Sequence, residues 1–208
     1  MKIGILGSGD IGGSLGQLWS RAGHQVFYAS RHPESLQKLA QRSGEAGVGS
    51  VEEAIAFSDT LLDALPFGVS VELTPAKLQG KTLLHASNYY EKRDGHIEMN
   101  GLSQSEYLAQ RLPETRIIKA FNMMFASEMQ ARVDADPERE VAIFVAGDED
   151  SGREIAKALI HDAKFVPVDA GALAKGRLFE SGGPLYARRF NAAEALAELA
   201  ATDSTSSS

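Results

Sequence analysis

The sequence predicts an α/β protein built on a Rossmann-type, doubly wound and mainly parallel sheet of about eight strands, followed by a C-terminal helical stretch. Two observations predict this fold. Short apolar segments alternate along the chain with segments whose apolar residues recur at helical spacing, a pattern typical of a parallel sheet covered by helices. The chain also starts with an apolar strand, residues 2–6, that runs into the glycine-rich turn Gly7-x-Gly9-x-x-Gly12.

Length and composition narrow the class of protein. A chain of 208 residues can bury one substantial core, so we expect one domain with at most a modest appendage. The net charge of −7 gives no basic surface for nucleic acid, and no apolar run is long enough to cross a bilayer. The chain has no cysteine, which excludes disulfides and thiol chemistry. Residues 2–6 are expected to be the first strand rather than part of a signal peptide, and the protein is expected to be cytoplasmic.

The glycine turn indicates dinucleotide binding. Gly7 permits a tight turn after the strand, Gly9 leaves the backbone open to a pyrophosphate, and Gly12 lets the next helix approach the strand. The helix that follows would present unpaired N–H groups to the phosphates, so Ser8, Asp10 and Ile11 join the glycines as candidate cofactor contacts. The alternative is a tight strand-to-helix turn without a ligand.

The end of the second strand, residues 25–29, indicates which dinucleotide binds. NAD-binding proteins usually have an acidic residue here that accepts a hydrogen bond from the ribose, whereas this chain has Ser30-Arg31-His32. A hydroxyl and a guanidinium offer donors and positive charge to a ribose phosphate, which favours NADP(H). The alternative is a solvated arginine at a strand end.

The remaining elements continue the alternation. Strands are expected at residues 46–49, 60–65, 82–86, 116–121, 141–146 and 165–168. Helices are expected from Pro33, from the capping box at Ser50 through Ala56, at 68–78, at 103–112 and through Ile160. Residues 89–101 are polar and turn-rich, and are either a flap over the site or an ordinary surface loop.

These elements divide the chain into three parts. Residues 1–172 are predicted to form the NADP-binding Rossmann domain. Residues 173–202 form a helical extension that a break at Gly182-Gly183-Pro184 interrupts. Residues 203–208 are a polar, serine-rich tail that we expect to be disordered.

Ligands of such a sheet bind beyond the carboxyl ends of its strands. The residues that follow three central strands are therefore predicted to surround a nicotinamide ring. They are Leu65, Pro66 and Phe67 after the fourth strand, Ser87 and Asn88 after the fifth, and Asn122 and Met123 after the sixth. Two amides can fix a carboxamide or a ring carbonyl, and Phe and Met can contact a flat apolar face. The alternatives are a core position for Phe67 and a helix cap for Asn122.

A general acid or base is harder to find. The Tyr-x-x-x-Lys pair of short-chain dehydrogenases is absent, and His85 in the fifth strand is predicted to be a core residue. No His, Asp and Glu residues have the spacing of metal ligands, so no metal is predicted. We assign no catalytic residue and expect Asn122, Met123, Asn88 and Phe67 to position the substrate. Hydride transfer to a flavin-like ring needs orientation more than a strong acid, because the cofactor carries the chemistry.

Five stretches together resemble the NADPH-dependent deazaflavin (coenzyme F420) reductases, and also the nucleotide-binding domain of transmembrane ferric reductases. The likeness runs from Met1 to about Glu180, and its stretches are Gly7–Gly13, Ser30-Arg31, Ala120-Phe121-Asn122, Gly147–Asp150 and Asp169–Glu180. The resemblance implies an eight-stranded Rossmann sheet, NADP(H) with Ser8, Ser30 and Arg31 on the ribose phosphate, and direct hydride transfer to an isoalloxazine-like ring. Where family members often have a further basic residue, this chain has Ser35, and only His32 lies close. At the C-terminal end it has Arg188-Arg189-Phe190 instead of an apolar helix.

The function predicted from the sequence is hydride transfer between NADP(H) and a small-molecule acceptor, with a flavin or deazaflavin as co-substrate. Two alternatives remain open. One is a non-catalytic NADPH-binding module that senses redox state through a partner. The other is an imine or hydroxyacid reductase whose site is completed across a homodimer, because the second helical domain of those enzymes is missing.

Overall fold

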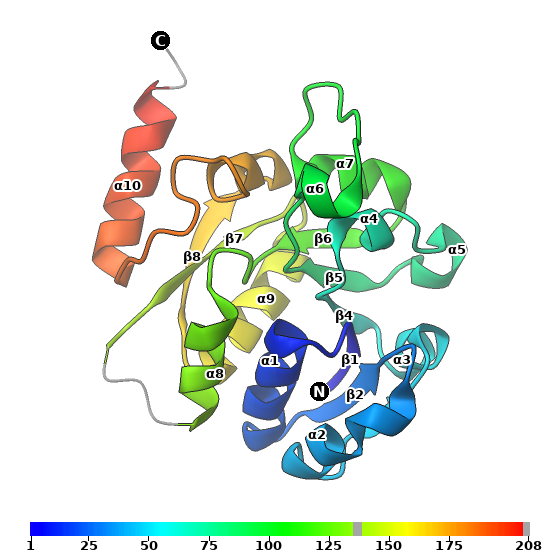
Figure 1. Cartoon of the computed structure of the whole chain (residues 1–208). Helices are drawn as coiled ribbons and strands as arrows, with labels where there is room; N and C mark the ends of the chain where they lie inside the picture. Colours follow the sequence, from blue (N-terminus) through cyan, green and yellow to red (C-terminus); the bar gives the residue numbers. More distant parts are fainter. Residues whose placement is uncertain (135–138, 206–208) are drawn as a thin grey trace.

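The computed structural model describes residues 1–134 and 139–205. Its centre is one eight-stranded sheet in the order β3-β2-β1-β4-β5-β6-β7-β8 (Figure 1). The strands are β1 (Lys2–Leu6), β2 (Gln25–Ala29), β3 (Gly47–Gly49), β4 (Thr60–Asp63), β5 (Thr82–His85), β6 (Arg116–Lys119), β7 (Ala142–Ala146) and β8 (Val166–Gly171). The order reverses direction beside β1, as in a doubly wound sheet, so the predicted fold class is confirmed.

Helices cover both faces of the sheet. The described helices are α1 (Asp10–Arg21), α2 (Gln37–Arg42), α3 (Val51–Phe57), α4 (Phe67–Ser70), α5 (Pro75–Leu78), α6 (Glu91–Asp94), α7 (Gln104–Arg111), α8 (Ala126–Asp134), α9 (Asp150–Asp162) and α10 (Ala192–Thr205), with 3-10 turns η1 (Pro33–Leu36) and η2 (Leu173–Leu178). One face of the sheet packs on α1 and α9 through a core that includes Trp19, whose indole donates to the Leu159 carbonyl. The other face packs on α3 and α7 through Ile55, Leu83 and Leu108.

The six strands β1 to β6 run parallel to one another, but β7 runs antiparallel to β6, and β8 is parallel to β7. Lys119 and Ala146 form the one registered pair between β6 and β7. The sheet is therefore mainly parallel, as predicted, with one reversal that the alternation of elements does not reveal.

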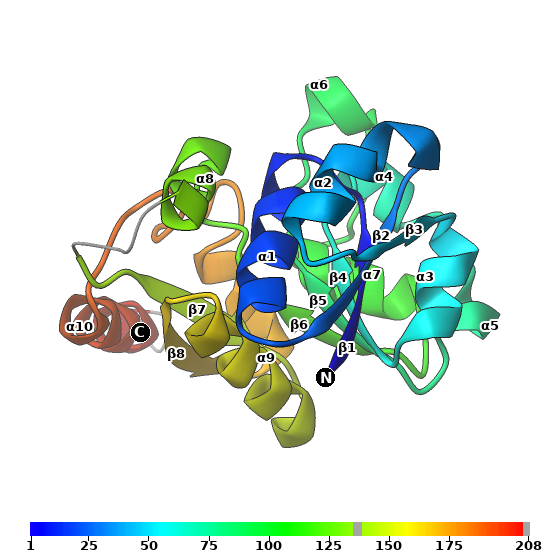
Figure 2. The same cartoon turned by 90° about the horizontal axis from the view of Figure 1, so that it is seen from below.

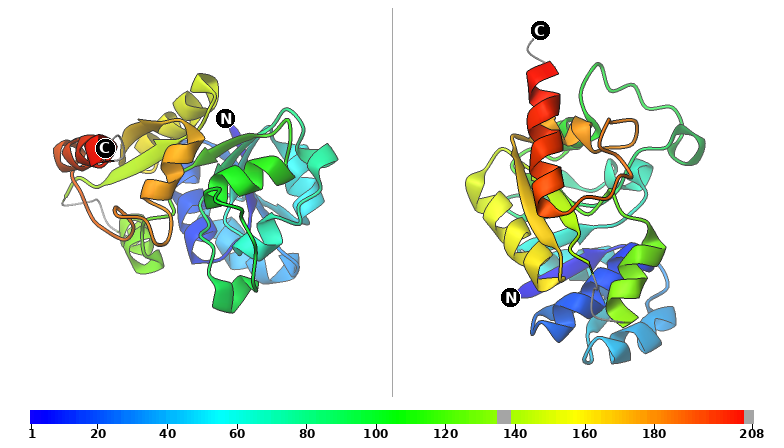
Figure 3. Two further views of the ribbon diagram at one scale, coloured as in Figure 1. Left: turned by 90° about the horizontal axis from the view of Figure 1, so that it is seen from above. Right: turned by 90° about the vertical axis from the view of Figure 1, so that its left-hand side faces the viewer.

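The C-terminal part folds back along the sheet. After η2 the chain crosses the edge of the central strands, and α10 then lies beyond β8 at the outer edge of the sheet (Figures 1 and 3). Phe144, Phe179 and Phe190 form the centre of a third apolar cluster between the sheet and this segment.

Several element bounds differ from those expected. The helix expected at 68–78 is two short helices, α4 and α5, because Pro75 begins a new turn. The stretch 89–101 contains α6, and the final helical stretch is coil between η2 and α10. The backbone of α10 continues to Thr205, three residues into the expected tail, while residues 206–208 lie outside the described residues.

Candidate functional site

The three glycines of the N-terminal turn have different surroundings. Gly7 has a φ of +95°, and a Cβ there would lie 2.7 Å from the Ala64 carbonyl oxygen. A Cβ at Gly12 would lie 2.0 Å from the Gly7 carbonyl oxygen, whereas a Cβ at Gly9 would meet nothing within 4 Å. Gly7 and Gly12 therefore shape the turn, and Gly9 leaves open space at the edge of the sheet.

Helix α1 begins at this open space. Its N-cap is Gly9, and no side chain caps it, so the first N–H groups of the helix lack a side-chain acceptor. The edge of the sheet that carries the start of α1 also carries α4 and α6 (Figure 2). The first N–H groups of α1 can bind an anion such as a pyrophosphate, because free N–H groups and the helix dipole favour negative charge.

The residues after β2 lie next to the glycine turn. The Ser8 hydroxyl donates to the Ala29 carbonyl at 2.6 Å, which joins the turn to the end of β2. Ser30 Oγ accepts from the His32 N–H at 3.0 Å, and His32 approaches Glu34 at 3.4 Å. The Arg31 side chain is exposed and makes no hydrogen bond or ion pair with any described residue. Its guanidinium therefore has donors that no described residue uses, and such a group can pair with an anion.

Asn88 and Asn122 come together as predicted, but mainly to bind each other. Asn88 Nδ2 donates to the Asn122 carbonyl at 2.8 Å, and Asn122 Nδ2 donates to Asn88 Oδ1 at 3.0 Å and to the Phe179 carbonyl at 2.7 Å. Both side chains are buried. The pair therefore supports the edge of the sheet from within, and Asn122 makes no cap to α8.

Two other predicted residues are also buried. The Phe67 ring is fully buried and packs against His85, Tyr89 and Tyr107, while Met123 belongs to the third apolar cluster. The Phe67 ring is thus a core element and has no free face for a ligand. Pro66 remains exposed, and Leu65 is half-buried, so these residues keep a surface at the end of β4.

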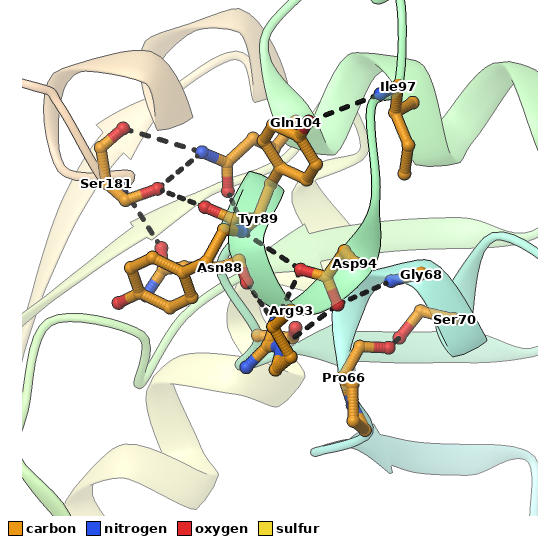
Figure 4. Close-up of polar contacts among 12 residues, drawn as sticks. Pro66, Gly68, Ser70, Asn88, Tyr89, Arg93, Asp94, Ile97, Gln104 and Ser181 are labelled. Atoms are coloured by element: carbon orange, nitrogen blue, oxygen red, sulfur yellow. Dashed lines mark hydrogen bonds and ion pairs between the residues drawn. The ribbon is translucent and has the colours of Figure 1, made fainter.

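The segment after η2 closes this part of the site. Ser181 Oγ donates to the Tyr89 carbonyl and accepts from Gln104, while the Ser181 N–H donates to Asn88 Oδ1 (Figure 4). Tyr186 contacts Tyr90 through the two hydroxyl groups. These bonds join residues more than 70 positions apart, and the motif analysis did not assign the segment to the site.

A buried polar cluster lies behind the same strands. His85 is confirmed as a core residue, and its Nδ1 contacts Asp63 Oδ2 at 2.9 Å. Burial and the Lys119 ammonium lower the pKa of His85, so its imidazole is neutral near pH 7. Burial also lowers the pKa of Lys119 to about 8, although the Glu180 and Asp63 carboxylates oppose this shift.

Glu180 anchors the closing segment within this cluster. Its carboxylate is 3% exposed and accepts from the Gln104 N–H and the Ser105 N–H at 2.9 Å each, at the start of α7. The Lys119 ammonium donates to the Ser87 carbonyl. Lys119 and Glu180 were missed because their roles depend on contacts between distant segments.

The stretch 89–101 is held at its base rather than free. Asp94, whose side chain is 1% exposed, accepts from the Gly68 N–H at 3.2 Å and from the Tyr90 N–H at 2.9 Å (Figure 4). The Tyr89 hydroxyl accepts from the Ile97 N–H and donates to the Gly95 carbonyl. These contacts fix α6 beside α4.

Neither a metal centre nor a membrane span is found in the described part of the chain. Within residues 1–134 and 139–205, no three His, Asp or Glu side chains are grouped to hold a metal ion. Over the same residues, no helix combines the length and the apolar character needed to cross a membrane.

Comparison with known proteins identifies relatives of this site. Residues 2–89 match the family described as NADP oxidoreductase coenzyme F420-dependent. Metalloreductase STEAP3 of Rattus norvegicus is 32% identical over 86% of this chain and 36% of its own length. Metalloreductase STEAP2 of Homo sapiens is 27% identical over 87% of this chain and 35% of its own length. The chain thus spans about a third of the length of these curated relatives.

Solved structures show the same fold. A hypothetical protein from Sinorhizobium meliloti superimposes with a TM-score of 0.75 at 25% identity, over 92% of this chain and 95% of the other. A protein from Arthrobacter sp. FB24, described as an F420-dependent NADP reductase, has a TM-score of 0.70 at 22% identity, over 85% and 87%. A reductive aminase of Aspergillus terreus in complex with NADPH has a TM-score of 0.61 at 18% identity, over 84% and 56%.

These matches confirm the resemblance that the motifs predict. The homologues are NADP-dependent oxidoreductases and metalloreductases, and NADP(H) is the cofactor that the matched family names. The acceptors differ among them.

Proposed function

We propose that this chain binds NADPH across the glycine turn and the end of β2, and transfers a hydride to a flavin- or deazaflavin-like acceptor at the ends of β4 and β5. The proposal proceeds from the match of residues 2–89 to NADP oxidoreductases. One observation carries it: Arg31 is exposed without a partner among the described residues, beside a glycine turn whose central position is open.

The end of β2 fits a ribose phosphate. Arg31 would donate to the phosphate, and the Ser30 and Ser8 hydroxyls both lie at the end of β2. Glu34 is the nearby carboxylate, and its contact with His32 keeps it beside that side chain. A charge-assisted contact of this kind contributes about 1.5–3 kcal/mol, so Arg31 would distinguish NADPH from NADH.

The glycine turn fits the pyrophosphate. A Cβ at Gly9 would meet nothing within 4 Å, and Gly9 is the N-cap of α1, whose first N–H groups have no side-chain cap. The side chain of Asp10 is exposed at the first position of the helix, and Ile11 is half-buried beneath it. Gly7 and Gly12 then serve the geometry of the turn rather than the ligand.

The nicotinamide would lie where the central strands end. Leu65 and Pro66 supply apolar surface, and two buried polar atoms, Ser87 Oγ and Asn122 Oδ1, have no hydrogen-bond partner in the described structure. A carboxamide is the group that could pair with such atoms, because it both donates and accepts. The Asn88–Asn122 pair and Ser181 hold these positions in place.

When bound, NADPH supplies two electrons and a proton as a hydride, and water supplies the further proton that a reduced flavin takes up. The protein's part is to hold the two rings in position for the transfer. A general acid or base would have to contact the strand ends. Among the described residues, no exposed histidine or lysine side chain contacts Pro66 or Asn88. Positioning is therefore the contribution that the site can make.

A second candidate is an imine or hydroxyacid reductase. It is favoured by the likeness in fold to imine reductases and reductive aminases, of which this chain covers 56% to 57%. The missing part would have to come from a second copy of the chain. A third candidate is an NADPH-binding module without turnover, which would lack any acceptor.

An acceptor screen that follows NADPH oxidation distinguishes these candidates. FMN, a deazaflavin, a quinone, a metal chelate and a small cyclic imine are tested side by side. Turnover of the flavin or deazaflavin alone supports the proposal, while turnover of the imine alone supports the second candidate. NADPH binding without any turnover would contradict both.

Arg31→Ala tests the cofactor assignment in the same assay. We expect NADPH affinity to fall by roughly tenfold to a hundredfold while NADH affinity stays nearly unchanged, because the lost contact is to the ribose phosphate. Lys38→Ala, at an exposed cation on α2, is the matched control. Equal losses for both cofactors would mean that Arg31 does not bind the phosphate. Calorimetry with each dinucleotide measures this.

A further inference from the structure

Arg93 is a cation at the expected acceptor side of the site. It belongs to α6, which lies next to α4 at the edge of the sheet where α1 begins (Figure 2). Its side chain is 43% exposed, and its Nη2 donates to the Asn88 carbonyl at 2.6 Å, at the end of β5 (Figure 4). Arg93 therefore stands beside the place where the central strands end.

Three contacts fix the orientation of this guanidinium. Asp94 accepts from Nε and from Nη2 at 2.9 Å each, and the Asn88 carbonyl accepts from Nη2. The Tyr90 ring lies under the guanidinium carbon at 5.1 Å. Burial raises the pKa of Asp94, but hydrogen bonds from Arg93, Tyr90 and Gly68 outweigh this and lower it, so Asp94 remains an ionised anchor.

The contacts leave one end of the guanidinium open. Of the five N–H donors of an arginine, the two on Nη1 have no acceptor among the described residues. The amide nitrogens of Asn88 and Asn122, which the sequence predicts as ligand contacts, donate to each other's residue and to the closing segment. Arg93 therefore offers free N–H groups in a fixed orientation at the ends of the central strands. The amide nitrogens predicted to do this already have partners.

We propose that Arg93 is a specificity-determining residue that selects hydride acceptors with a phosphate group on the side chain of the ring. This inference rests on the proposed function and names a feature of its acceptor. The fork of Nε and Nη2, which matches a carboxylate, is already filled by Asp94. A phosphate is the better fit for Nη1, because its several oxygens can take both N–H groups of one nitrogen.

Pairs of acceptors with the same ring test this proposal. FMN and riboflavin share the isoalloxazine ring and differ in one phosphate, and coenzyme F420 is compared with its phosphate-free chromophore. The ratio of kcat/KM within each pair gives the phosphate preference. Binding of each compound to the NADP⁺-loaded protein, followed by fluorescence, gives the same preference without turnover.

We expect the wild-type protein to prefer the phosphorylated member, and Arg93→Gln to lower that preference by about tenfold. Lys92→Gln is the matched control, because Lys92 is an exposed cation on the same turn and lacks a bonded partner among the described residues. It should change the preference by less than about twofold. Arg93→Lys keeps the charge without the fixed orientation, and a loss of about threefold is expected. It serves as the test if thermal melting shows that Arg93→Gln is unfolded.

Three results would overturn the inference. They are an unchanged preference in the Arg93 variants, an equal loss in Lys92→Gln, and a parallel loss of NADPH affinity, which would mean that Arg93 binds the dinucleotide. Failure of the proposed function looks different. In that case the wild-type protein neither binds nor reduces any of the four compounds.

Discussion

The two parts of the candidate site are built in different ways. Around β1 and β2 the cofactor side is made by one short stretch and the end of the next strand, and Gly9 and Arg31 are open to solvent. Around β5 and β6 the acceptor side is made by residues far apart in the chain, and Asn88, Asn122 and Glu180 are buried. This difference indicates that the geometry of a short backbone stretch is enough to form the dinucleotide side. The acceptor side depends on how segments far apart in the sequence pack over the sheet.

The largest effect is expected from removing the anchor of the closing segment. Glu180→Ala should lower the free energy of unfolding by about 3–5 kcal/mol, because it removes a buried carboxylate from Lys119 and from the start of α7. Urea unfolding measures the loss. Glu106→Ala, at the exposed capping box of the same helix, is the control and should cost about 1 kcal/mol.

The two sides should respond separately if the comparison is right. In the folded Glu180→Ala protein, affinity for NADPH should stay within about twofold of the wild-type value, because the hydrogen bonds of Glu180 go to Gln104 and Ser105 and not to the cofactor side. A parallel loss of NADPH affinity would show that the closing segment also builds the cofactor side.

The glycines of the turn should separate folding from binding. Gly9→Val places its side chain in open space at a residue with extended backbone, so the protein should keep its melting temperature and lose NADPH affinity by about a hundredfold or more. Gly12→Val should instead destabilise the fold, because its Cβ would lie 2.0 Å from the Gly7 carbonyl oxygen. Calorimetry and thermal melts decide between the two. A folded Gly9→Val protein that binds NADPH would remove the phosphate role of this turn.

The smallest effect, taken per pH unit, is a pH dependence of stability on the acceptor side. The pKa of Lys119 is about 8 in the folded protein and near its usual value of 10.5 when unfolded, so the unfolded chain binds more protons between these values. Stability should therefore rise as the pH increases from 8 to 10.5, by at most about 1.4 kcal/mol per pH unit. Urea unfolding of the wild-type protein and Lys119→Met over this range measures the difference. Equal slopes in the two proteins would mean that Lys119 keeps its ordinary pKa.

The sequence predicts the cofactor side well because its signals are local. The alternation of strands and helices, the glycine turn and the Ser30-Arg31 pair after β2 follow from apolar periodicity and from residues next to one another. On the acceptor side, the sequence predicts which residues follow the strands, but not whether their side chains are buried or what they bind. Phe67 is in the core because its ring packs against His85, Tyr89 and Tyr107. The two amides bind each other, and Asn122 also binds the Phe179 carbonyl, 57 positions away.

Other differences have the same origin. The reversal of β7 leaves no mark on the pattern of apolar residues, since its strand is buried on both faces whichever way it runs. The ordered base of the 89–101 stretch depends on Asp94, and a single aspartate in a polar stretch gives no signal of burial. Glu180 lies within a motif of the resembled family, but its place against α7 is visible only in three dimensions.

The antiparallel pairing of β6 with β7 affects how firmly the last two strands are held to the rest of the sheet. From β1 to β6, each strand pairs with the strand that precedes or follows it in the sequence. The exception is the pairing of β1 with β4. Across the junction of β6 and β7 the ladder has one registered pair, so β7 and β8 are held to the rest chiefly by the packing of α9 and of the closing segment. Because this junction has few ladder bonds, we expect the amide protons of β7 and β8 to exchange with solvent faster than those of β1 and β2. The end of β6, which carries Asn122, lies at that junction, whereas the ends of β1 and β2, which form the cofactor side, lie away from it.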